Sequence, residues 1–311
     1  MSPAPSASPE CHWVVAVIAS ATDLYDSLPE NIQRAVRLGY FALHPRLSLA
    51  GRRKMQTVDE AFVNRFFDGR AEFERYRKEF LDGRVVDICI RADETAPDGM
   101  TIYDAPRSTC AKLYGLIRTR RPDVLVETGV YNGVSTLSML LALERNGTGT
   151  LYSIDNSDRS LESDGAGVSS PKPGSFYERG RPSCADPQSA VLPPKKEPGW
   201  LVPEDLHTYW ERSTGPTQRQ LVSVLNTVEE VDLFLHDSVH SVSGMFTEFS
   251  LAWEWLSDGG ILLSNHVDRN DVFERFAEEH GCDHGLYDYV YDLQNPEYDE
   301  PCSCGYVVKE R

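Results

Sequence analysis

One stretch of the sequence, VLVETGVYNGVS at residues 124–135, constrains the fold more than any other. Its apolar run ends in the acid Glu127, and Gly129 and Gly133 then flank Tyr131 before a helix-like apolar pattern begins. This order predicts a strand, a tight glycine turn and the start of a helix. Glycine lets the backbone approach a ligand closely, and the first N–H groups of a helix attract a carboxylate or phosphate.

A second short apolar run, residues 151–154, ends in Asp155. An acid at the end of the second strand is placed to accept hydrogen bonds from both hydroxyls of a ribose. Glu127, Asp155 and Asp237 each follow an apolar run, so we expect them at one rim of a parallel sheet, where ligands bind. Together these features predict a site for a nucleoside-like ligand.

Strand-like and helix-like patterns alternate along the chain from this point. The expected strands are 124–127, 150–154, 209–212, 231–235, 261–263, 286–291 and 305–308, and the expected helices are 134–145, a helix opened by 215–218 and ending at 225, 243–256 and 270–279. This alternation predicts an α/β fold with a mostly parallel Rossmann-like sheet and helices on both faces. The last two strands are expected to form an antiparallel pair at the sheet edge.

The chain divides by pattern into residues 1–103, a tail with a helical extension, and residues 104–311, the ligand-binding domain. The helices of the extension would cover the substrate mouth, mediate a homodimer, or only pack; the pattern leaves these open. Residues 157–203 interrupt the domain, because eight prolines and five glycines in 47 residues exclude regular structure. Such an insert is typical of a mobile lid or substrate-selecting loop, with a plain surface insert as the alternative.

The charge of the chain is strongly acidic, with 48 acidic and 31 basic residues and a net charge of −17. This balance disfavours nucleic-acid binding, which needs a basic surface. Only seven of the basic residues are lysine. An acidic, lysine-poor surface is typical of a salt-rich cytosol, where screening weakens self-repulsion; an ordinary acidic enzyme is the alternative.

No stretch approaches the roughly 20 apolar residues of a membrane span. The longest candidate, Trp13–Ala21, follows no lysine or arginine, as a secretory signal would require. Seven cysteines, an odd number scattered through a long chain, argue against a disulfide framework. We therefore expect a cytoplasmic protein that does not bind membranes.

The segment ETGVYNGVS and the strand ends after it resemble the class I S-adenosylmethionine-dependent methyltransferases, specifically small-molecule O-methyltransferases of the catechol O-methyltransferase type. The resemblance covers about residues 104–308, less the insert. It implies the class I methyltransferase form of the sheet, S-adenosyl-L-methionine as cofactor, and a small molecule or sugar as acceptor. The cofactor-binding residues that it implies are Glu127, Gly129, Tyr131, Gly133, Ser135, Asp155, Thr217, Gln218 and Asp237.

The resemblance also implies roles for some of these residues. Tyr131 would lie near the sulfonium, and Ser135 would bind the methionine carboxylate. Asp155 would bind the ribose hydroxyls, and Thr217 and Gln218 would contact the adenine edge.

At the catalytic end, the resemblance makes Asp237 the first ligand of a divalent metal and puts His240 at the position of the general base. The second and third ligands, usually an Asp-Asn pair, are replaced here by Asn265 and His266. Losing a carboxylate weakens a Mg²⁺ site, and an imidazole shifts preference toward a transition metal such as Mn²⁺. His240 could take a hydroxyl proton without any metal; a capping or core histidine is the alternative. His236 should face the other way and is not expected in the site.

A further set of zinc-ligand residue types lies near the C-terminus. A strand would put His280, Cys282 and His284 on one face, and Cys302 and Cys304 alternate likewise, but the spacing matches no common zinc pattern. Reduced thiols are the preferred interpretation.

Two other functions stay open. A nicotinamide-dependent oxidoreductase is disfavoured because its fingerprint requires glycine where Tyr131 stands. A methyltransferase-like fold that serves as a non-catalytic binding subunit is the second alternative.

Overall fold

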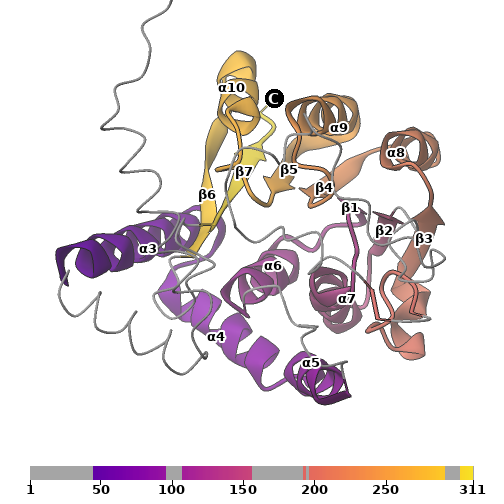
Figure 1. The fold of residues 1–311 in the computed structure, drawn as a ribbon, viewed down its shortest axis with the longest axis horizontal. Coiled ribbons are helices and arrows are strands. Elements are labelled where there is room, and N and C mark those ends of the chain that lie inside the picture. Colours follow the sequence, from indigo (N-terminus) through magenta and orange to yellow (C-terminus); the bar gives the residue numbers. More distant parts are fainter. Residues whose placement is uncertain (1–44, 96–106, 156–191, 194–195, 291–301, 311) are drawn as a thin grey trace, which may run out of the picture.

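The computed structural model describes residues 45–95, 107–155, 192–193, 196–290 and 302–310. Its strands are β1 (Val124–Thr128), β2 (Thr150–Asp155), β3 (Trp210–Thr214), β4 (Val231–His236), β5 (Leu256–Ser264), β6 (Asp283–Val290) and β7 (Cys302–Val308). They form one seven-stranded sheet in the order β3-β2-β1-β4-β5-β7-β6 (Figure 1). Neighbouring strands from β3 to β5 are parallel, and β7 runs antiparallel to both β5 and β6. The predicted mostly parallel sheet with an antiparallel edge is confirmed.

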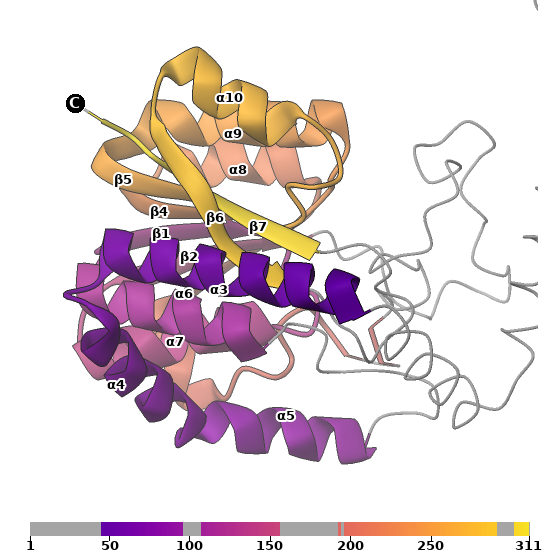
Figure 2. The same ribbon diagram turned by 90° about the vertical axis from the view of Figure 1, so that its left-hand side faces the viewer.

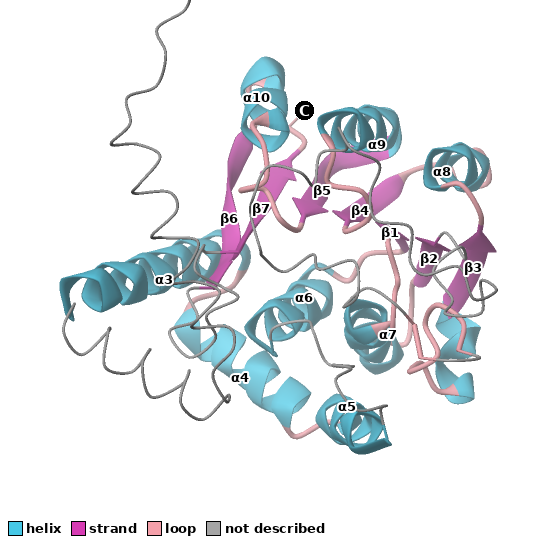
Figure 3. Cartoon of the chain, viewed as in Figure 1, coloured by secondary structure: helices cyan, strands magenta, loops and turns pink. Residues whose placement is uncertain are grey.

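Helices cover both faces of this sheet (Figures 1 and 2). On one side of the sheet lie α3 (Pro45–Phe66), α6 (Arg107–Arg120) and α7 (Val134–Asn146). Helices α4 (Arg70–Leu81) and α5 (Arg84–Thr95) pack on the outer side of α6 and α7. The other face carries α8 (Thr217–Leu225), α9 (Val242–Trp255) and α10 (Val272–His280). A short 3₁₀ helix, η3 (Glu204–Tyr209), leads into β3, as the secondary-structure colouring shows (Figure 3).

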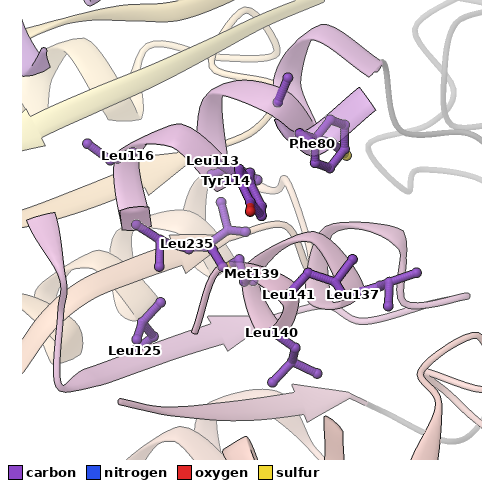
Figure 4. Close-up of a cluster of buried hydrophobic side chains, with 14 of the residues drawn as sticks. Phe80, Leu113, Tyr114, Leu116, Leu125, Leu137, Met139, Leu140, Leu141 and Leu235 are labelled. Carbon is purple, nitrogen blue, oxygen red and sulfur yellow. The ribbon is translucent and has the colours of Figure 1, made fainter. Parts of the chain in front are cut away.

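Each face of the sheet has its own apolar core. Leu116 of α6, Leu125 of β1 and Leu140 of α7 belong to one of these cores, and Phe80 of α4 extends the same core (Figure 4). On the opposite face, residues of α8, α9 and α10 pack on the sheet around Phe249. Burial of apolar surface on both sides is what holds the parallel strands in the interior.

The N-terminal helices share the first of these cores. Phe62 of α3 is fully buried, and its ring centroid lies 5.9 Å from that of Tyr287 in β6 and 6.2 Å from that of Tyr306 in β7. Helix α3 therefore covers the antiparallel end of the sheet. The boundary expected at residues 103 and 104 lies outside the described residues.

Two elements differ from the prediction. The helical pattern of the N-terminal extension runs from Asp23 to about Arg84, so helix α5, which begins at Arg84, lies beyond the run that this pattern predicts. Strand β5 is longer than 261–263 because it does not break at residues 258–260, where glycines suggested a turn. There the backbone N–H of Gly259 donates to the carbonyl of Lys309, and the N–H of Lys309 donates to the carbonyl of Gly260, so the ladder continues.

None of the described helices has the length and apolar character needed to cross a bilayer. Residues 157–191 of the insert, for which a lid was expected, lie outside the described residues, as do residues 194–195. The end of the insert, 196–203, is described and bears on the site below.

Candidate functional site

The turn between β1 and α7, residues 129–133, is called the glycine turn here. Three of its residues have φ angles in the left-handed region: 89° for Gly129, 52° for Tyr131 and 91° for Gly133. A Cβ atom on Gly129 would lie 2.0 Å from the carbonyl oxygen of Asp237. Glycine is required at this position because the turn and the loop after β4 are in direct backbone contact.

Asp155, at the end of β2, closes the glycine turn. Its Oδ2 accepts hydrogen bonds from the backbone N–H groups of Val130 (2.7 Å) and Tyr131 (2.8 Å). Its own carbonyl accepts from the N–H of Gly215, 2.9 Å away. Asp155 therefore joins the turn to the loop after β3.

Thr217 and Gln218, expected at the adenine edge, are the first two residues of α8, just beyond that loop. Thr217 is half-buried and Gln218 is exposed. The structure thus brings both to the same edge of the sheet as Asp155.

Helix α7 begins at Val134 without a side-chain cap on its N-terminal N–H groups. Gly133 is the capping residue, and Ser135, the second residue of the helix, is half-buried. Backbone N–H groups of this kind and a nearby hydroxyl suit a carboxylate. The residues present therefore fit the carboxylate that the resemblance assigns to Ser135.

The end of the insert lies on the glycine turn. The N–H of Gly199 donates to the carbonyl of Tyr131 (2.8 Å), and Nε1 of Trp200 donates to Oδ1 of Asn132 (2.9 Å). Neither Asn132 nor Trp200 was expected at the site. Their pairing spans 68 positions of the chain, and no local pattern indicates it.

Glu127 lies beneath the turn and not at the open rim where it was expected. Its side chain is fully buried, and its Oε1 accepts hydrogen bonds from the hydroxyls of Thr136 and Ser153, each at 2.6 Å. Loss of solvation raises the pKa of this carboxyl to about 8; the two hydroxyls oppose the rise, and the charges of Asp237 and Asp155 add to it. Both acids therefore lie close to Glu127.

The catalytic end of the site is a cluster of Asp237, His240 and His266, called the Asp–His cluster below. Ligand-type atoms of all three half-buried side chains lie within 4.8 Å of one another. Nε2 of His240 is 3.8 Å from Oδ1 of Asp237, and the rings of His240 and His266 stand nearly perpendicular with centroids 4.7 Å apart. The loops after β4 and β5 thus meet here, as their parallel pairing requires.

The side chain of Asn265 contacts a residue outside this cluster. Its Oδ1 accepts a hydrogen bond from the hydroxyl of Tyr287, a fully buried residue of β6. Burial raises the pKa of that phenol well above its usual value, so it remains a donor at neutral pH. Of the Asn265–His266 pair, His266 faces Asp237 and His240.

His236 lies behind the cluster. As strand alternation predicts, its side chain points to α9, where Nδ1 lies 2.8 Å from Oε2 of the fully buried Glu248. The turn after β4 nevertheless brings His240 back over it, with ring centroids 5.2 Å apart. Glu248 also accepts from the hydroxyls of Thr128 and Ser238. Nothing in the sequence indicated Glu248, because its role depends on where α9 packs.

The cysteine and histidine residues near the C-terminus are not arranged on one strand face. His280 ends α10, where its ring packs on Phe276, whereas His284 lies within β6. Cys282 and Cys304 are free thiols, and the side chain of Cys302 is outside what is described. Across the described part of the chain, these residues form no group able to hold a metal ion.

Comparisons with known proteins bear on this arrangement. Residues 126–267 match the model of a family described as "Methyltransferase domain". No curated protein sequence matches the chain.

Three solved structures are similar to this chain at low sequence identity. An O-methyltransferase of Bacillus cereus, in complex with SAH, is 13% identical over 82% of this chain and 97% of its own, with a TM-score of 0.45. The O-methyltransferase TomG of Streptomyces achromogenes, in complex with SAM, is 14% identical over 83% and 98%, with a TM-score of 0.44. The SAH-bound methyltransferase PaMTH1 of Podospora anserina is 14% identical over 73% and 87%, with a TM-score of 0.43.

The family match begins inside β1 and ends just after His266, so it spans both the glycine turn and the Asp–His cluster. The predicted resemblance to the S-adenosylmethionine-dependent methyltransferases is therefore confirmed over residues 126–267, which match the model of a methyltransferase domain.

Proposed function

We propose that the protein transfers a methyl group from S-adenosylmethionine to a hydroxyl oxygen of a small molecule or sugar, with His240 as the general base. One observation carries the proposal. The backbone of Gly129 in the glycine turn packs directly on the carbonyl of Asp237, three residues before His240. A cofactor held by the turn would lie beside an imidazole that can accept a proton.

S-Adenosylmethionine, when bound, supplies an electrophilic methyl group. The chain has to hold the two reactants in line and remove the hydroxyl proton of the acceptor. His240 performs the second task, since imidazole titrates near neutral pH. The carboxylate of Asp237, 3.8 Å from His240, would stabilise the imidazolium that forms. This assignment requires no metal ion.

For cofactor binding, we assign the ribose hydroxyls to Asp155, the carboxylate to Ser135 and the start of α7, and the adenine edge to Thr217 and Gln218. Asp155 supports this because it already ties the glycine turn to the loop before α8. Tyr131, held at a φ of 52°, would contact the sulfonium. A residue other than glycine adopts such a conformation only at a cost in conformational energy. Residues held in this way are common at binding sites.

Isothermal titration with S-adenosylmethionine tests the cofactor assignment. Asp155→Asn keeps an oxygen for the N–H groups of Val130 and Tyr131 but removes the charge that a ribose would use. We expect about ten- to hundredfold weaker binding, the value of one or two hydrogen bonds to a charged group. Glu254→Gln, at an exposed position on α9, is the matched control and should bind like the unaltered protein. Binding of NAD in place of S-adenosylmethionine would contradict the proposal.

The role of His240 is tested with the same preparation and a panel of phenolic and sugar hydroxyl acceptors. His240→Ala should abolish turnover and leave the affinity for S-adenosylmethionine within about threefold of the unaltered protein, because the base does not hold the cofactor. Turnover equal to that of the unaltered protein would remove His240 from the mechanism. Cofactor binding with no turnover on any acceptor would favour a binding subunit.

Pairing of two copies through the N-terminal helices is a further proposal, which light scattering on the full chain would test.

A further inference from the structure

The Asp–His cluster occupies the position where the resemblance implies a Mg²⁺ ion, but its residues do not fit that ion. Mg²⁺ binds in octahedral geometry through oxygen, chiefly carboxylates and water. Here Asp237 supplies the one carboxylate of the cluster. The oxygen of Asn265 is engaged by the hydroxyl of Tyr287, and His266 offers nitrogen. A site for a hard cation has therefore been replaced by one carboxylate and two imidazoles.

We propose that Asp237, His240 and His266 bind a divalent first-row transition ion such as Zn²⁺ in preference to Mg²⁺. Imidazole nitrogen is a preferred ligand of Zn²⁺, and two imidazoles with one carboxylate form a three-ligand set that leaves positions open for water. Such a set also carries a single negative charge.

The present separations of the three side chains are compatible with closure on an ion. Neighbouring ligands of a bound zinc ion lie about 3.0–3.4 Å apart, from metal–ligand bonds of about 2.0–2.1 Å. The ligand atoms of the cluster lie within 4.8 Å of one another, and the His240–Asp237 separation is already 3.8 Å. Movements of the ligand atoms of the order of 1 Å, by rotation of the side chains, are sufficient to bring them to these separations.

The backbone around the cluster is fixed, which lowers the cost of assembling such a site. The N–H of Asp237 donates to the carbonyl of Thr128 (2.8 Å), and the N–H of Asn265 donates to the carbonyl of His236 (2.9 Å). The side-chain amide of Asn270 donates to the carbonyl of His240 (3.1 Å). These bonds tie the two loops that carry the ligands to each other and to β1.

The conformation of His266 gives an independent indication of function. Its φ of 53° lies in the left-handed region, which is unfavourable for a residue with a Cβ atom. Residues held in such conformations by the surrounding structure are concentrated at functional sites. In this conformation the imidazole ring lies 4.7 Å from that of His240, measured between ring centroids.

Metal binding has a consequence for the proposed methyl transfer. A nitrogen that coordinates a metal ion cannot accept a proton, so an ion in the cluster would occupy the general base. Zn²⁺ should therefore inhibit turnover, whereas Mg²⁺ should have no effect. This consequence rests on the proposed function, but metal binding itself does not.

Direct metal titration of the full chain tests the site, with Zn²⁺, Mn²⁺ and Mg²⁺ chloride in competition with a chromophoric chelator. We expect one equivalent of Zn²⁺ to bind, Mn²⁺ to bind more weakly, and Mg²⁺ not to bind at millimolar concentration. His266→Asn should weaken Zn²⁺ binding at least tenfold. His284→Asn removes an exposed histidine outside the cluster and should leave binding unchanged.

Two controls keep the test decisive. Asp237→Asn is a second variant in case His266→Asn does not fold, as judged by circular dichroism. The absorption spectrum of the Co²⁺-loaded protein should lack a sulfur-to-cobalt charge-transfer band, because no cysteine belongs to the cluster. Equal Zn²⁺ affinity in the unaltered protein and both variants, a thiolate band, or tight Mg²⁺ binding would overturn the proposal. Titration with S-adenosylmethionine on the same samples reports separately on the proposed function.

Discussion

Replacing Glu127 with Gln should make the stability of this protein less dependent on pH. The pKa of Glu127 is raised from 4.5 to about 8 in the folded chain, chiefly by loss of solvation. Between these values the folded state keeps a proton that the unfolded state has lost. The contribution of Glu127 to the free energy of unfolding therefore falls as the pH rises from about 4.5 to about 8. Above that range this contribution no longer changes with pH. Glutamine has no proton to lose, so the variant lacks this term.

The size of the effect follows from the same interval. Each pH unit between the two pKa values lowers the free energy of unfolding of the unaltered protein by about 1.4 kcal/mol relative to the variant. Over the whole interval, the difference between the two proteins therefore changes by an amount of the order of 5 kcal/mol. The substitution is closely matched in contacts. An amide oxygen can still accept from Thr136 and Ser153, and the second polar atom of residue 127 is buried without a hydrogen-bond partner among the described residues.

Urea denaturation at five pH values from 5.5 to 9.5 measures this difference. We expect the free energy of unfolding of Glu127→Gln, minus that of the unaltered protein, to increase up to about pH 8 and then to level off. Subtraction removes the contribution of every other titrating group. Glu254→Gln, exposed on α9, should show no such trend. A difference for Glu127→Gln that is independent of pH would refute the reasoning, because the carboxyl would then titrate alike in both states.

Three further predictions concern the turn, the buried ion pair of Lys112 and Asp288, and the metal. Gly129→Ala should weaken S-adenosylmethionine binding more than tenfold, since its Cβ would meet the Asp237 carbonyl at 2.0 Å; unchanged affinity in titration would contradict this. Lys112→Met should lower the free energy of unfolding by about 3–5 kcal/mol, because it leaves the buried Asp288 without its cation. In the same urea assay, Lys78→Met at an exposed position should lower it by under about 0.5 kcal/mol. Exhaustive chelation should leave turnover unchanged or raise it; loss of turnover would show that a metal is required.

Much of the fold follows from local patterns. The turn at 129–133 was predicted because its signal is short-ranged: glycines flank a tyrosine between a strand and a helix. Helix α7 and strand β4 lie within one residue of their expected bounds, since apolar periodicity depends on which face is buried. Asp258, Gly259 and Gly260 misled the prediction, because the long-range pairing with Lys309 outweighs a local preference for a turn.

The candidate site likewise combines features set by local sequence with features set by long-range contacts. The sequence alone determined which residues can do chemistry: the acid Asp155 after the second strand, and Asp237 and His240 three positions apart after the fourth. Only the tertiary structure decided how they are used. It buries Glu127 under the turn, engages Asn265 with Tyr287, and directs His266 to His240. The physical reason is that residue type and spacing set the possible interactions, whereas solvation and the partner of each polar group depend on segments that meet only when the sheet assembles.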